Sequence, residues 1–154
     1  MECSIGRTVA IVGQRWTPVI LRAIFEGRRR FDGIQEELGI ARNILSDRLR
    51  TLEAHGILER KHYSTHPPRQ EYHLTAKGMA LWPVLVTLMA WGDRFTSGEA
   101  GPPVILRHAG CGQDTNPYLV CSHCEEAIAA RDVSWRAGPG VLWGEALGTE
   151  GRGG

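Results

Sequence analysis

Apolar residues recur three or four positions apart along most of the first 95 residues, and this spacing predicts helices. The predicted helices cover residues 3–12, 16–25, 31–38, 42–54 and 75–95. Residues 58–74 depart from this spacing and predict a two-stranded hairpin instead. Gly39 turns the chain into the helix over residues 42–54, and Gly56 caps that helix at a position where a left-handed residue is favoured. The expected fold class is therefore mainly α with a small β wing (α+β).

The helix over residues 42–54 separates apolar from polar side chains by face. Leu45, Leu49 and Leu52 line one stripe. The opposite face carries the candidate DNA-binding residues Arg42, Asn43, Ser46, Asp47 and Arg50. Since Arg, Asn and Ser side chains can meet base edges and phosphates, this face suits a DNA major groove. A polar face can also be only solvated, so its neighbours along the chain have to decide.

Two neighbouring segments favour DNA binding over a solvated face. A short helix, residues 31–38, comes before at the spacing of a helix-turn-helix, and the hairpin that follows is basic. The hairpin carries Arg60, Lys61, His66 and Arg69 on or beside its exposed tip. We therefore predict a winged helix-turn-helix in which His66 and Arg69 contact flanking DNA.

Six segments between Cys3 and Phe95 form a specific combination. They are Cys3 at the start of the first helix, GQRWTPVILRAI at 13–24, RRF at 29–31, LSDRLRTLEAHGILER at 45–60, PPRQEYHLTAKG at 67–78 and WGDRF at 91–95. In these segments the chain resembles the HxlR-type family of bacterial winged-helix regulators, relatives of the MarR group. The resemblance implies a homodimeric transcription factor, which we expect to be a repressor that binds double-stranded DNA at a roughly palindromic operator.

The helix predicted over residues 75–95 carries an apolar seam of coiled-coil type. Its members are Leu81, Val84, Leu88, Trp91 and Phe95. Such a seam can pack on its own domain, but in the implied architecture a partner chain is the more plausible cover. We therefore expect a homodimer through this helix and the first helix. Pro83 removes the hydrogen bond to the carbonyl of Met79 and should kink the helix.

The composition fits one compact domain with an appendage. The chain has 154 residues, of which 42% are hydrophobic. Its formal net charge of +1 hides an asymmetry, because residues 1–77 sum to +4 (13 Lys/Arg, 9 Asp/Glu) and residues 78–154 to −3 (5 and 8). The positive half is the one predicted to bind DNA, where the release of counterions from phosphates would supply affinity.

Targeting and domain order follow from the same inspection. The N-terminus lacks a basic region followed by an apolar run, and the most apolar stretch is about half as long as a membrane span. We therefore expect a cytoplasmic protein that does not bind membranes. The expected order is a winged helix-turn-helix and dimerisation domain at 1–98, a linker at 99–103, a Cys/His-rich, zinc-ribbon-like module at 104–137, and a partly disordered Gly-rich tail at 138–154.

Three of the four cysteines lie close together beside a histidine. His108 and Cys111 form one pair of ligand-x-x-ligand type, Cys121 and Cys124 form another, and nine residues separate the pairs. Two such pairs can close a tetrahedral zinc site. Four protein ligands would leave no open coordination position, so the zinc would be structural.

Three alternatives to this zinc site stay open. His123 could replace His108 as the fourth ligand. The second cysteine pair could instead be a redox dithiol, since residues 118–120 resemble a strand and residues 125–130 a helix. The cysteines could also be small core residues that bind nothing.

Cys3 starts the first predicted helix, where the helix dipole favours a thiolate. The resemblance implies a role for it, because in several such regulators the matching cysteine senses electrophiles or oxidants. Cys3 is therefore a candidate redox sensor, and a buried small residue at a helix start is the alternative.

An enzymatic function is not expected. No arrangement of Ser, His and Asp or of Cys and His stands out, and no phosphate-binding Gly loop follows a strand. The second function we consider is a thiol-redox or metal-responsive interaction protein without DNA binding. The presence of Arg42, Asn43, Arg50 and Arg69 argues against it.

Overall fold

The computed structural model describes residues 3–65 and 68–140, without the side chains of residues 63–69. The chain divides into two compact units, the first up to Pro103 and the second from Val104 on. Each unit is considered by itself below. Among the described helices, none is both long enough and apolar enough to cross a membrane.

Two predictions concern residues that this description does not include. The tail expected to be partly disordered lies almost entirely at 141–154, outside the described residues. The DNA contact expected of His66 lies outside them as well.

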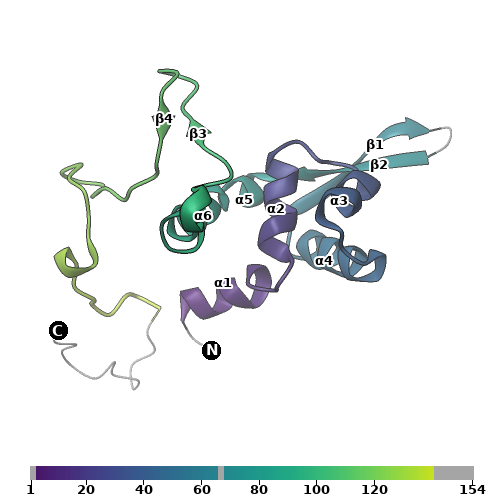
Figure 1. Ribbon diagram of the computed structural model, residues 1–154. Coiled ribbons are helices and arrows are strands. Elements are labelled where there is room, and N and C mark those ends of the chain that lie inside the picture. Colours follow the sequence, from purple (N-terminus) through teal and green to yellow (C-terminus); the bar gives the residue numbers. More distant parts are fainter. Residues whose placement is uncertain (1–2, 66–67, 141–154) are drawn as a thin grey trace. The chain divides into compact units, whose positions relative to one another are not determined.

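The first unit is an array of short helices with one hairpin (Figure 1). Its elements in chain order are α1 (Ser4–Val12), α2 (Thr17–Phe25), α3 (Phe31–Leu38), α4 (Arg42–Ala54), β1 (Leu58–Thr65), β2 (Pro68–Leu74), α5 (Ala76–Met79), α6 (Trp82–Thr96) and the 3-10 turn η1 (Gly98–Ala100). Helices α1 to α4 and the hairpin lie within one residue of their predicted bounds. Gly56 has a φ of 66°, which confirms its predicted left-handed position, and Gly39 at the turn before α4 has a φ of 59°.

The prediction of a single helix over residues 75–95 is wrong. Helix α5 ends at Met79, and α6 begins only at Trp82. Between them the N–H of Leu81 donates to the carbonyl of Gly78 at 3.0 Å, a three-residue bond that tightens the chain. Pro83 then lies in the first turn of α6, where no intrahelical hydrogen bond is lost and its fixed φ suits a helix start. The proline therefore begins a helix and does not kink one.

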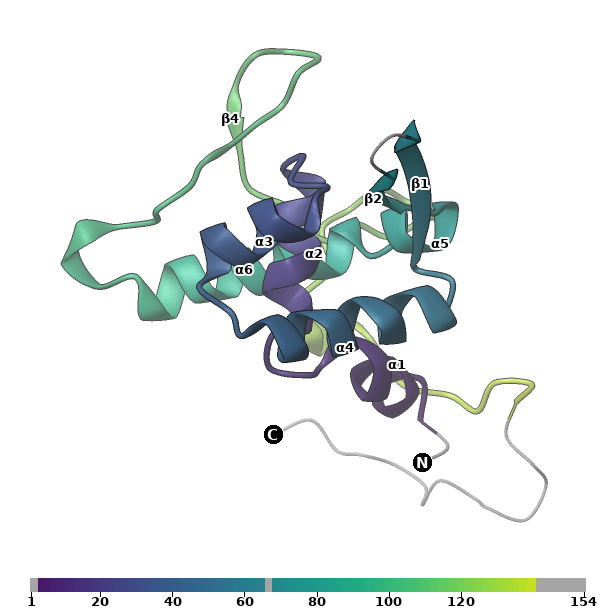
Figure 2. The same cartoon turned by 90° about the vertical axis from the view of Figure 1, so that its right-hand side faces the viewer.

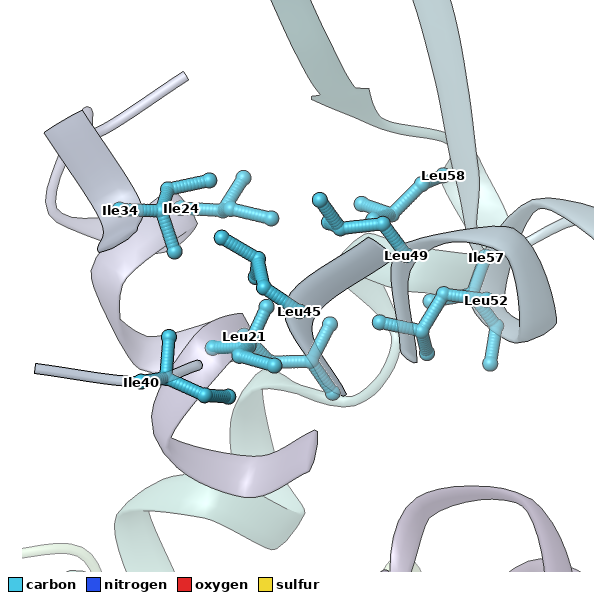
Figure 3. Packing of buried hydrophobic residues seen from close by; sticks show 10 residues of the cluster. Leu21, Ile24, Ile34, Ile40, Leu45, Leu49, Leu52, Ile57 and Leu58 are labelled. Carbon is cyan, nitrogen blue, oxygen red and sulfur yellow. The ribbon is translucent and has the colours of Figure 1, made fainter. Parts of the chain in front are cut away.

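The core of the first unit lies between α2, α3, α4 and the start of β1. Its buried cluster is Ile20, Leu21, Ile24, Ile34, Ile40, Leu45, Leu49, Leu52, Ile57 and Leu58. Figure 3 shows the leucines of α4 pointing among side chains from the other elements. Leu45, Leu49 and Leu52 are at most 1% exposed, so the predicted apolar stripe is confirmed. Burial of each such side chain contributes about 1.5–3 kcal/mol to folding.

Strands β1 and β2 pair antiparallel and extend beyond the helices (Figure 1). Leu58 pairs with Leu74 at the root, and the register shifts at a bulge between His62 and Ser64. The N–H of Tyr72 in β2 also donates to the carbonyl of Arg29 at 2.7 Å. This bond holds the segment before α3 against the hairpin, so helix-turn-helix and wing share one support.

The second unit contains little regular structure. Its elements are β3 (Leu106–Arg107), β4 (Asp114–Thr115), a bridge between Val120 and Ala127, and the 3-10 turn η2 (Ala130–Asp132). None of residues 104–140 is buried, so this part of the unit has no apolar core. The helix over residues 125–130 that the dithiol alternative supposes is not formed, and these residues include the bridge partner of Val120.

Candidate functional site

Helix α4 presents a polar face on the side opposite its buried leucines. Figure 2 looks onto this helix, with α3 beside it and the β1–β2 hairpin rising from its C-terminal end. Arg42, Asn43, Asp47 and Arg50 are exposed, and Ser46 is half-buried. The two faces predicted for this helix are therefore present, with its leucines buried and its charged residues exposed.

The charged residues of this face differ in how firmly they are held. Arg42 lies 3.5 Å from the Asp32 carboxylate and 4.7 Å from the ring centroid of Phe31, so it is anchored to the start of α3. Asp47 pairs with Arg48 at 3.4 Å. Arg50 has no ion pair or hydrogen bond to another described side chain, and its charge is available to an anion.

The wing is tied to the C-terminal end of α4 by an ion pair. Nη2 of Arg60 donates to Oε2 of Glu53 at 2.7 Å, and its Nε donates to Oε1 of the same carboxylate. These hydrogen bonds raise the pKa of Arg60. The guanidinium also lies 5.9 Å from the ring centroid of Tyr72, whose pKa is raised by burial. Arg60 is thus engaged at the root of the wing and not at its tip, contrary to our expectation.

Sequence reasoning missed this pair because its members are seven residues apart in different elements. It also missed the ion pairs that the arginines before α3 form. Arg28 lies 2.9 Å from Glu37, and Arg30 lies 3.2 Å from Glu71 in β2. Both bind within the unit. Arg69 belongs to β2 and pairs with Ser64 of β1. Its side chain, like that of the neighbouring wing residues, lies outside the described part of the structure.

Helices α1 and α6 border an apolar groove of about 660 Å³. Ile5 and Val9 of α1 line it together with Val84 and Leu88 of α6. Farther along α6, Trp91 and Phe95 are 61% and 60% exposed, and their rings lie 5.4 Å apart. No residue of α1 is buried. Of the predicted seam only Leu81 packs on the core, and the other four members face outward.

Cys3 is the N-cap residue of α1, and it is exposed. The backbone N–H groups of Gly6 and Ile5 lower the pKa of its thiol, because they stabilise the thiolate at the open end of the helix. The positive charge of Arg7 acts in the same direction. The alternative of a buried small residue therefore does not describe Cys3 in this chain.

The four predicted zinc ligands come together as two pairs. Nδ1 of His108 lies 3.3 Å from Sγ of Cys111. Cys121 and Cys124 also contact each other, and the backbone N–H groups of Cys124 and His123 lower the pKa of the Cys121 thiol. Within the described residues, no three metal-binding side chains gather at one point. The pairs are formed, but the structure does not join them.

Comparison with known proteins identifies the first unit. Residues 11–100 match the family model described as HxlR-like helix-turn-helix. The chain belongs to this family. The resemblance predicted from the sequence is confirmed, and the position of the winged helix-turn-helix agrees with it.

Matched relatives carry regulator names. An uncharacterised HTH-type transcriptional regulator of Mycobacterium tuberculosis (strain ATCC 25618 / H37Rv) is 47% identical over 137 residues, which are 89% of this chain and 87% of that protein. The crystal structure of the candidate transcription factor PA1607 is 33% identical with a TM-score of 0.78, over 87% of this chain and 94% of that one. The redox regulator HypR in its oxidised form is 31% identical with a TM-score of 0.57, over 60% and 96%.

The extent of these matches bears on the second unit. The first unit ends at Pro103, so a match over 137 residues must include part of the residues that follow. HypR, in contrast, matches only about the length of the helix-turn-helix unit. The similarity to the mycobacterial regulator therefore extends beyond the first unit, and the similarity to HypR covers a shorter part of this chain.

Proposed function

We propose that this HxlR-like regulator binds double-stranded DNA as a homodimer, with α4 in the major groove of a roughly palindromic operator. The observation that supports it best is α4 itself. Leu45, Leu49 and Leu52 fix the helix to the core, while Arg42 and Asn43 stand exposed on its other side. A helix held in this way presents side chains that read base edges at a fixed angle.

The residues divide by the kind of contact they suit. Arg50 has a charge without a partner among the described side chains, and we assign it to phosphate. Asn43 and Ser46 carry both donors and acceptors, so we assign them to base edges. Arg69 and His66 on the wing would meet the flanking minor groove or phosphates. Phosphate contacts set the position on DNA, and base contacts set the sequence.

The homodimer rests on the apolar groove between α1 and α6. Leu88 is 55% exposed and Val9 is 54% exposed, and such neighbouring apolar side chains mark an interaction surface. A second copy of the chain presents the same surface of α1 and α6, so the two surfaces can pack against each other about a two-fold axis. The two α4 helices would then enter successive major grooves about 34 Å apart.

Footprinting on the DNA upstream of the protein's own gene tests the proposal, followed by selection from genomic fragments. We expect two protected half-sites one helical turn apart, and increased transcription of a reporter when the regulator is removed. Protection of a single half-site would contradict the dimeric mode. No protection in either assay would leave the alternative, a thiol-redox or metal-responsive protein without DNA binding.

A second function, regulation by oxidants, is favoured by Cys3. Its thiol is exposed, and its pKa is lowered by the N–H groups of the first turn of α1. Because α1 borders the proposed dimer groove, a change at Cys3 would alter the spacing of the two α4 helices. Operator affinity should fall on treatment with diamide in the wild type and not in Cys3→Ser. An equal fall in both proteins would remove Cys3 from the mechanism.

A further inference from the structure

The second unit contains two turns with the same backbone hydrogen bonds. In the first turn the N–H of His108 donates to the carbonyl of Gln113 at 2.9 Å. The N–H of Gly112 donates back to the carbonyl of His108 at 2.8 Å. Gly112 has a φ of 69°, so the residue directly after Cys111 is left-handed.

The second turn repeats this arrangement thirteen positions later. The N–H of Cys121 donates to the carbonyl of Glu126 at 2.8 Å, and the N–H of Glu125 donates to the carbonyl of Cys121 at 2.9 Å. Glu125 has a φ of 61°, although it is not a glycine. Left-handed backbone is strained for such a residue. The second turn therefore has the same conformation as the first, although the residue directly after Cys124 is not a glycine.

Each turn brings its first and fourth side chains together. His108 and Cys111 meet in one turn, at 3.3 Å, and Cys121 and Cys124 meet in the other. Gly110 leaves room for the imidazole, since a Cβ at that position would lie 2.9 Å from Cε1 of His108. The equivalent position in the second turn is His123. By this correspondence His123 is an inner residue of its turn, and His108 matches the ligand position of Cys121.

No apolar side chain of residues 104–140 is buried. Tyr118, Leu119 and Trp135 are 76%, 64% and 91% exposed. The β3–β4 hairpin is only two residues long on each side. A unit this poor in buried side chains requires another source of free energy, and a bound metal ion supplies it in small cysteine-rich modules.

We propose that the two turns are the halves of one structural zinc site, with His108, Cys111, Cys121 and Cys124 as its four ligands. Zn²⁺ in structural sites prefers four ligands in a tetrahedral arrangement, and thiolate and imidazole groups are among those it binds. Binding of Zn²⁺ releases the three thiol protons to solvent, because cysteine binds the metal as thiolate. The ion joins the turns and orders the unit. This inference does not depend on DNA binding.

Metal analysis of the full-length protein purified without chelator tests the site. We expect about one zinc per chain, and a cobalt-substituted protein with the visible absorption of a tetrahedral, thiolate-ligated ion. Cys111→Ser and His108→Ala should lose most of the metal. His123→Ala is the matched control, because it makes the same change at an inner position of the other turn, and it should keep the metal.

Loss of metal could also follow from misfolding, so the wild-type protein supplies a second measurement. Removing zinc with a chelator should expose residues 104–140 to proteolysis while the first unit stays intact. Zinc well below one per chain, with Cys121 and Cys124 recovered as free thiols or a disulfide, would overturn the proposal. Metal retained by His108→Ala and lost by His123→Ala would overturn the ligand assignment.

Discussion

Glu53 in the last turn of α4 and Arg60 in β1 form a two-point ion pair that connects the proposed recognition helix to the wing. Glu53 is 19% exposed, so the carboxylate is largely covered, whereas Arg60 is 46% exposed. The angle between helix and wing decides whether both can reach DNA together. We therefore expect this pair to set the angle between α4 and the wing, although neither residue is expected to touch DNA.

Arg60→Met should weaken operator binding and cost about 0.5–1 kcal/mol of unfolding free energy, since a half-exposed pair is screened by solvent. Methionine keeps most of the side chain over Tyr72 and removes the charge. Urea denaturation measures the stability, and fluorescence anisotropy with labelled operator measures the affinity. Lys61→Met, which removes a charge that pairs with Glu59 within the same strand, is the control. Equal effects of both changes would mean that charge alone matters.

Gly78→Ala should destabilise the first unit strongly. A Cβ at this position would lie 2.3 Å from the carbonyl oxygen of Ile57 and 2.9 Å from Cδ2 of Leu74. The carbonyl is backbone and cannot turn away, so we expect a loss of about 1–3 kcal/mol or more. Gly92→Ala is the matched change, because its nearest atom is 3.6 Å away and alanine favours the helix. Thermal unfolding should separate the two variants, and similar midpoints would contradict the close approach.

The sequence carries most of the information about the first unit and little about contacts between its elements. The stripe of Leu45, Leu49 and Leu52 is periodic, so helix and buried face could be predicted together. The break after Met79 could not, because periodicity continues across it and only the turn at Leu81 shows that a new helix begins. Pairing of Glu53 with Arg60 depends on how the wing folds back, which no local pattern records.

At the cysteines, too, the sequence predicts part of the arrangement but not all of it. Spacing alone predicted the two ligand pairs, but it could not choose between His108 and His123. The distinction comes from the backbone, since Gly112 and Glu125 share a left-handed conformation and so align the two turns. A non-glycine residue at such a position gives no sequence signal.

Arg50→Ala should weaken binding to all DNA sequences to a similar extent. We expect the slope of log affinity against log salt to fall by about one, as for loss of one phosphate contact. Asn43→Ala should instead relax the preference for one base pair, by about 1–3 kcal/mol. Arg107→Ala, in the second unit, removes an equal charge and serves as the control. An unchanged salt slope for Arg50→Ala would assign this residue a different role.

Leu88→Asp should convert the proposed dimer to monomer. The change places a carboxylate in the apolar groove between α1 and α6, where a partner chain would have to bury it unpaired. Sedimentation velocity measures the mass, and operator affinity should fall with it. Ala10→Asp adds the same charge at an exposed position of α1 that does not line the groove. If Leu88→Asp sediments as an unaltered dimer, the two copies associate through another surface.

Alkylation of Cys3 by iodoacetamide should depend on pH differently in the folded and the unfolded chain. The thiolate is the reactive form, and the N–H groups of Gly6 and Ile5 lower the thiol pKa in the folded state. The midpoint of the rate profile should therefore lie at lower pH in buffer than in urea, where α1 is lost. By linkage, ionised Cys3 favours the folded state above its unfolded pKa, and this contribution disappears as the pH falls through the folded pKa. Peptide-level mass spectrometry follows Cys3 apart from the other cysteines. Coincident midpoints in buffer and urea would show that the helix start does not activate this thiol.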